Sequence, residues 1–110
     1  MLHYTYISAD NTSTNGTALG VAGQDVVLKA IVFGLGADAV YATVYDEVNP
    51  FTGATTNIAA KVTQPTAAAG KNYVPEFVFG GAGLRLGNGG NVVTSASQVT
   101  VIWDDLEPAG

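Results

Sequence analysis

Short runs of alternating apolar and polar residues recur along this chain, and glycine, proline or asparagine residues separate them. Residues 40–45 alternate small aliphatic side chains with tyrosine and threonine, and residues 99–103 place valine and tryptophan on one face. Alternation with a period of two is typical of strands that are buried on one side. Helical periodicity does not extend over any segment of useful length. The pattern predicts an all-β fold of about seven or eight short antiparallel strands.

The most apolar run, from Val26 to Phe33, carries apolar residues on both of its faces. Such a strand is expected to be buried on both sides. Pro75 places the run at 73–79 at a sheet edge or at a bulge, because proline cannot donate to a strand ladder. Asn88, Gly89 and Gly90 give the strongest hairpin signal in the chain. Strands are therefore expected at residues 1–8, 26–33, 40–45, 55–62, 73–79 and 84–86, from 92 onward, and at 99–103.

The first 23 residues are predicted to form an extended arm and a linker. Residues 1–8 place Leu2, Tyr4 and Tyr6 on one side of the chain and His3, Thr5 and Ile7 on the other. Residues 9–24 carry few large apolar groups, which is typical of a loop. The expected organisation is an N-terminal arm and linker at 1–23 and a single small β-sandwich or jelly-roll-like domain at 24–110. The turns do not decide between these two strand orders.

The composition argues against a catalytic or metal site more strongly than it supports any particular function. The chain has 110 residues, no cysteine and one histidine, so thiolate or multi-histidine metal sites and cysteine nucleophiles are excluded. The net charge of -5, with only four Lys plus Arg, makes nucleic acid an unsuitable partner. Residues 34–39 match a dinucleotide-binding pattern, but a β-alternating run follows them where a helix is needed. We expect no enzyme activity, no catalytic residues, no metal and no cofactor.

Targeting signals also narrow the picture. The first ten residues have neither a basic region nor an apolar run of the length that a signal peptide needs. Apolar runs are too short to cross a membrane as a helix. We therefore expect a protein made in the cytoplasm that has no membrane partner.

The low charge is the most informative feature for function. Charged residues make up 12% of the chain, about half the usual share of roughly 25%. Low charge combined with apolar strands is an aggregation hazard unless partners cover the surface. These features favour a component of an assembly. The candidate interface residues are Leu2, Tyr4, Tyr6 and Ile7 of the arm, the strand tyrosines Tyr41 and Tyr45, and the single arginine Arg85.

The cadence of residues 24–104 resembles that of small bacteriophage virion proteins, especially capsid decoration (cement) proteins. The resemblance lies in the apolar run Val26–Phe33, the alternation at 40–46, the Ala/Thr-rich stretch to Lys71, the Phe79 corner leading into Gly83-Leu84-Arg85-Leu86, and the closing run 99–103. It implies a β-rich subunit, often a trimer, which binds the major capsid protein on the outer surface of the phage head. Such subunits reinforce the assembled shell and have no catalytic residues.

Two alternatives remain open at the level of sequence. The same composition suits another virion component, such as a head fibre, neck, tail or baseplate subunit. A carbohydrate-binding module is the second, because Tyr41, Tyr45 and Tyr73 on a β face could form a stacking platform for sugars.

Overall fold

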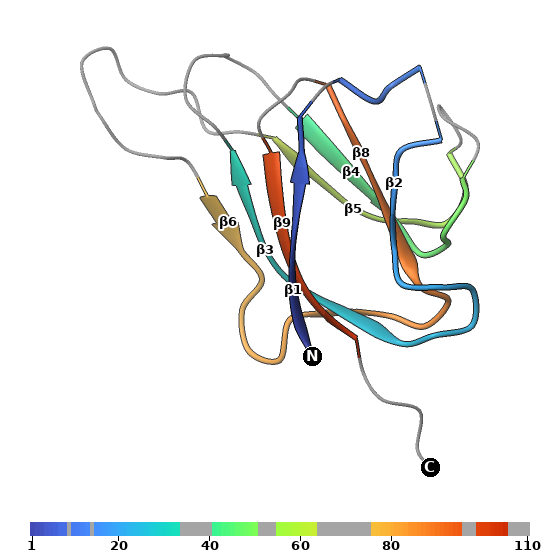
Figure 1. Ribbon diagram of the computed structural model, residues 1–110, viewed down its shortest axis with the longest axis vertical. Helices are drawn as coiled ribbons and strands as arrows, with labels where there is room; N and C mark the ends of the chain where they lie inside the picture. The colour runs from blue at the N-terminus through green and yellow to red at the C-terminus, as the bar shows by residue number, and fades with distance from the viewer. Residues whose placement is uncertain are drawn as a thin grey trace.

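The computed structural model describes residues 1–8, 10–13, 15–33, 41–50, 55–63, 76–95 and 99–105. These residues form strands and turns, and the strands make two antiparallel sheets (Figure 1). The strands are β1 (Leu2–Ile7), β2 (Thr17–Leu19), β3 (Val26–Phe33), β4 (Tyr41–Tyr45), β5 (Ile58–Thr63), β6 (Glu76–Val78), β7 (Leu84–Leu86), β8 (Gly90–Thr94) and β9 (Val99–Asp105).

The strand order is that of a jelly roll. The first sheet has the order β1-β9-β3-β6, with β7 also paired to β3, and the second sheet has the order β2-β8-β4-β5. Because β6 and β7 both pair with β3, on its two halves, they fill one strand position between them. Numbered in chain order, the eight strand positions are then arranged as 1-8-3-6 in the first sheet and 2-7-4-5 in the second, which is jelly-roll connectivity. The expected all-β sandwich is confirmed.

The core lies between the two sheets and is built from alternate residues of each strand. In the first sheet, Trp103 and Val101 of β9 lie opposite Leu28 and Ile31 of β3, and all four are 8% exposed or less. Val44 of β4 is fully buried on the second sheet. The core cluster comprises Ile7, Leu19, Val26, Leu28, Ile31, Phe33, Ala42, Val44, Val62, Leu86, Val92, Val99, Val101 and Trp103.

β3 has the limits that its sequence predicts, and it occupies the centre of the first sheet between β9 and the β6/β7 pair. Its pairing with β9 shifts register between Leu28 and Ala30, so Lys29 is the extra residue of a bulge. The Lys29 ammonium donates to the Ala82 carbonyl at 3.2 Å, and the Lys29 carbonyl accepts from the Phe79 amide at 2.9 Å. The bulge thus holds the segment that interrupts β6 and β7.

Residues 1–23 differ from the expected arm and linker, because they supply one strand to each sheet. β1 pairs with β9 along its whole length, and β2 pairs with β8. The connection between them is held by Asn11, whose side-chain amide donates to the Val92 carbonyl at 3.0 Å and is buried. The sandwich therefore includes the N-terminal segment. The sequence gives little sign of this, since β2 has only three residues and its neighbours are polar.

The Asn88-Gly89-Gly90 turn does not join a hairpin, and this part of the prediction is wrong. β7 before the turn belongs to the first sheet, whereas β8 after it belongs to the second. Gly89 has φ of 72°, and an added Cβ would lie 2.7 Å from the Val21 carbonyl oxygen. Its amide donates to the Gln24 carbonyl at 2.6 Å. The glycine is needed for a close crossing between sheets, which requires the same residue type as a tight hairpin.

Candidate protein interface

A row of uncharged side chains crosses the outer face of the first sheet. Strand register places Tyr4 of β1 opposite Ile102 of β9, Ile102 opposite Ala30 of β3, and Ala30 opposite Val78 of β6. Directly opposed residues of antiparallel strands project from the same face of a sheet. We call these four residues, Tyr4, Ile102, Ala30 and Val78, the apolar row.

The apolar row is exposed at both ends. Tyr4 is 67% exposed and Val78 is 60% exposed, while Ile102 is half-buried and Ala30 is buried between them. Figure 1 shows the four contributing strands side by side, with β1 and β6 on the outside. An apolar row of this kind on an outward face is unusual, because the outer face of an antiparallel sheet normally carries polar residues.

Mixed rows flank the apolar row on both sides. On one side, Leu2 lies opposite Asp104, and Val27 lies between Asp104 and Arg85. Arg85 makes an ion pair with Asp25 of its own chain. On the other side, Tyr6 lies opposite Thr100, and its side chain is 61% exposed. The arrangement of an apolar centre and a polar rim is that of a protein interface.

The outer face of the second sheet provides a comparison within the same molecule. There, Thr43 lies between Val93 and Lys61 in register. The Lys61 ammonium lies 4.5 Å from the centroid of the Tyr41 ring, which is a cation–π contact. This row carries a charge, which the apolar row of the first sheet does not.

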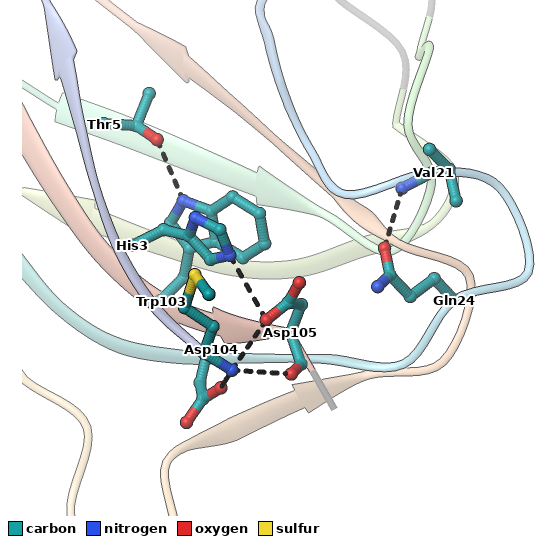
Figure 2. A network of polar contacts seen from close by, with 8 residues as sticks. His3, Thr5, Val21, Gln24, Trp103, Asp104 and Asp105 are labelled. Carbon is teal, nitrogen blue, oxygen red and sulfur yellow. Dashed lines mark hydrogen bonds and ion pairs between the residues drawn. The ribbon is translucent and has the colours of Figure 1, made fainter. Parts of the chain in front are cut away.

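The inward face of β1 fixes the strand to the sheet. The His3 ring stacks on the Trp103 ring with 4.3 Å between centroids and 18° between planes. Trp103 Nε1–H donates to Thr5 Oγ1 at 2.9 Å (Figure 2). Because both contacts lie on the inner side, Leu2, Tyr4 and Tyr6 of the same strand project outward. The outward residues are thus presented on an anchored strand.

The start of β1 also has an electrostatic anchor. The Met1 ammonium donates to Asp104 Oδ1 at 2.9 Å and lies 2.8 Å from Asp105 Oδ1. His3 Nε2 lies 3.2 Å from the same Asp105 oxygen. Hydrogen bonding to Asp105 and Asp104 raises the pKa of the Met1 amine to about 10. The ammonium and His3 in turn lower the pKa of the Asp105 carboxyl.

Three of the predicted interface residues lie together on the structure, and the fourth one predicted in β1 is buried. Leu2, Tyr4 and Tyr6 form the outward side of β1, as their alternation predicts, with exposed fractions of 45%, 67% and 61%. Ile7 is only 5% exposed and belongs to the core cluster. It has the parity of His3 and Thr5, so it faces inward where β1 enters the sandwich.

The strand tyrosines do not form an exposed pair. Tyr45 is 3% exposed, so it is not available at the surface of this chain. It keeps the parity of Tyr41 and Thr43, because β4 is in continuous register with β8 and the extra residue of the shift opposite β5 is Ala59. Tyr41 is half-buried beside Lys61, and Tyr73 lies outside the described residues. Arg85 is at the surface, where its carboxylate partner is Asp25 of the same chain.

Sequence reasoning missed Ile102, Ala30 and Val78 as interface residues. Each lies in a predicted strand, but the run at 26–33 is apolar on both faces and gives no sign of which face is outward. Ile102 alternates with Val101 and Trp103 along the strand, so the sequence does indicate that Ile102 faces away from the core. The row becomes visible only when the register of four strands is known.

Among the described residues, His, Asp and Glu side chains do not form a group of three that could hold a metal ion. The described part of the chain also has no helix of the length and apolarity needed to cross a membrane. No family model, curated protein or solved structure matches the chain. The function is therefore inferred from the geometry of the chain itself.

Proposed function

We propose that this chain is a structural virion protein of the capsid decoration type, which binds the outer surface of an assembled phage head and stabilises it. The observation that carries the proposal is the apolar row, whose ends Tyr4 and Val78 are 67% and 60% exposed. Exposed apolar side chains surrounded by a polar rim mark a protein contact. The resemblance of residues 24–104 to decoration proteins gives the class of partner, the major capsid protein.

The proposed activity needs binding and no chemistry. A subunit that bridges neighbouring capsid proteins binds the assembled shell better than dissociated subunits, and therefore stabilises the shell by mass action. A homo-oligomer, for which the resemblance favours a trimer, engages several symmetric capsid sites at once. Each contact after the first is then strengthened by effective concentration.

The first test is sedimentation of a lysate from the native source, with this protein quantified in each gradient fraction. Decoration predicts that the protein migrates with DNA-filled particles at hundreds of copies per particle. A dozen copies or fewer would instead identify a fibre, neck, tail or baseplate subunit. Protein that stays at the top of the gradient, free of particles, would overturn the virion assignment.

A second test asks whether the apolar row makes the contact. Val78→Asp places a charge at one end of the row, whereas Val21→Asp changes a residue of similar exposure, 65%, that lies outside it. Burying an unpaired carboxylate in an interface is expected to weaken binding to stripped heads by at least about tenfold. Val21→Asp should bind as the unmodified protein does. Equal binding by both variants would refute the assignment of the surface.

The carbohydrate-binding alternative is less well supported. A sugar platform needs exposed aromatic rings, but Tyr45 is 3% exposed and Tyr41 is covered in part by Lys61. Tyr4 and Tyr6 are exposed on β1, on a different sheet. A glycan array with hits that are lost in Tyr4→Ala would favour this alternative over decoration.

A further inference from the structure

The open edge of β1 differs from the other sheet edges. β2 is only three residues long, β5 carries Lys61 and pairs across a register shift, and β6 and β7 are separated by residues 79–83. Short strands, lysines and irregularities protect sheet edges against pairing with other chains. β1 has six residues in continuous register with β9 and carries neither lysine nor proline. Among the described residues, none pairs with its outer side.

The hydrogen bonds at the start of β1 establish which residues point outward. The Asp105 amide donates to the Met1 carbonyl at 3.2 Å, and the Met1 amine donates to the Asp105 carbonyl at 3.2 Å. Met1 and Asp105 are therefore a hydrogen-bonded pair. Because such pairs alternate along an antiparallel ladder, the N–H and C=O groups of Leu2, Tyr4 and Tyr6 point away from β9.

We propose that β1 pairs with β1 of a second copy of this chain, antiparallel and around a two-fold axis at Tyr4. In this register Leu2 lies opposite Tyr6 of the other copy, and Tyr4 lies opposite Tyr4. The outward backbone groups of positions 2, 4 and 6 are symmetric about position 4, so each donor meets an acceptor. The contact is isologous and self-complementary, as a two-fold interface requires.

The side chains and charges of β1 are compatible with a second copy. Leu2, Tyr4 and Tyr6 bring apolar or aromatic groups opposite one another on the outer face, and such cross-strand pairs stabilise a sheet. On the inner side, His3 lies opposite Thr5. The acids nearest this edge, Asp104 and Asp105, share the single Met1 ammonium, and the antiparallel register places the two such clusters at opposite ends of the paired strands. The net charge of -5 therefore opposes association only from a distance.

The pairing would also extend the apolar row. Tyr4 is its end on β1, so the two-fold axis joins the rows of both copies across one continuous sheet. This inference goes beyond the proposed function and does not depend on it, because it concerns the protein in solution. It also departs from the trimer that the resemblance favours.

The oligomeric state of the full chain, measured by sedimentation velocity over a range of concentrations, provides the test. The unmodified protein should form a dimer. Tyr4→Lys and Tyr4→Glu each place two like charges on the axis, and each should raise the dimer dissociation constant by at least about tenfold. An equimolar mixture of the two variants should recover a mixed dimer. A register centred on Tyr4 predicts this recovery, because Tyr4 then lies opposite Tyr4 of the other copy.

Cysteine cross-linking tests the same geometry independently. The chain has no cysteine, so Tyr4→Cys introduces a single thiol at the axis. Opposed residues of a hydrogen-bonded pair have Cα atoms about 5.5 Å apart, within the range of a disulfide. Tyr4→Cys should oxidise to a covalent dimer at least about tenfold faster than Val21→Cys, whose site is 65% exposed and away from the edge. A monomeric or trimeric unmodified protein, absence of the mixed dimer, or equal cross-linking of the two cysteine variants would each overturn the proposal.

Discussion

Replacing Asn11 by alanine tests whether the N-terminal segment is part of the sandwich. The Asn11 side chain is 7% exposed and lies beside the end of β8, beyond the point where β2 pairs with it. Its Nδ2 donates to the Val92 carbonyl at 3.0 Å and to Thr17 Oγ1 at 3.2 Å. Its Oδ1 accepts from the Thr94 amide and, at 3.1 Å, from the Thr94 hydroxyl. Asn11 thus takes the place of a neighbouring strand.

The expected loss in the free energy of unfolding follows from the polar groups that lose their partners when alanine replaces Asn11. The Thr94 amide loses its acceptor and the Val92 carbonyl loses a donor, and both lie in the buried strand β8. A buried polar group without a partner costs about 1–3 kcal/mol, so the free energy of unfolding should fall by roughly 2–4 kcal/mol. For a domain of this size that corresponds to a decrease in Tm of roughly 8–16 °C.

The assay is thermal and urea unfolding followed by circular dichroism, with Asn15→Ala as the matched control. Asn15 is exposed in the same connection, and alanine there should change the free energy of unfolding by less than about 0.5 kcal/mol. If Asn11→Ala and Asn15→Ala unfolded at the same temperature, the segment would be a detachable arm. That result would refute the reasoning.

Three further predictions concern other parts of the fold. The pKa of the Met1 amine is raised from 8.0 to about 10 and that of Asp105 is lowered from 3.8, so stability should fall between pH 8 and 10 and again below pH 3.8. Urea midpoints against pH should show both decreases, and an acetylated N-terminus should abolish the alkaline one. Gly83→Ala should destabilise by about 2–4 kcal/mol, because its φ is 91° and the new Cβ would lie 2.8 Å from the Leu28 carbonyl oxygen. Gly81→Ala, with φ of 63° and open space around it, should cost only about 1 kcal/mol by urea unfolding, and equal losses would contradict the packing argument. Trp103→Phe removes the hydrogen bond to Thr5 and leaves a smaller ring in the core, and should cost about 2–4 kcal/mol. A double-mutant cycle with Thr5→Val should show coupling between the two changes, and additive losses would contradict it.

The sequence predicts the strands well where the apolar pattern is long or regular. β3 has the predicted limits because a run that is apolar on both faces, with Lys29 as its one charged residue, favours a central strand. The core face of β9 is predicted correctly, because Val99, Val101 and Trp103 alternate with Thr100 and Ile102, which are only half-buried. β2 was missed because three residues are too few to show a period. Its existence depends on pairing with β8, which is distant in sequence.

Only part of the candidate interface could be predicted, because alternation along one strand does not reveal its tertiary contacts. Alternation in β1 separates Leu2, Tyr4 and Tyr6 from the inner residues, but it does not say where the strand enters the core. Ile7 shares the alternation of the inner residues His3 and Thr5, and its burial in the core agrees with that alternation. Tyr45 shares the alternation of Tyr41 but is buried, so its exposure depends on tertiary contacts that periodicity does not contain. The remaining row residues depend on the register between strands far apart in the chain.

The proposed capsid contact and the proposed dimer both use residues of β1, so each limits the geometry of the other. An exposed apolar edge strand normally leads to open-ended association, because each added chain presents a new edge. A two-fold contact at Tyr4 closes, since it uses the β1 edge of both copies, and the outer edges are then the interrupted β6/β7 positions. Association therefore stops at two copies while the apolar row, doubled in length, stays uncovered on one sheet face. The doubled row is a larger apolar surface than either copy offers alone, and covering it is the role proposed for the capsid.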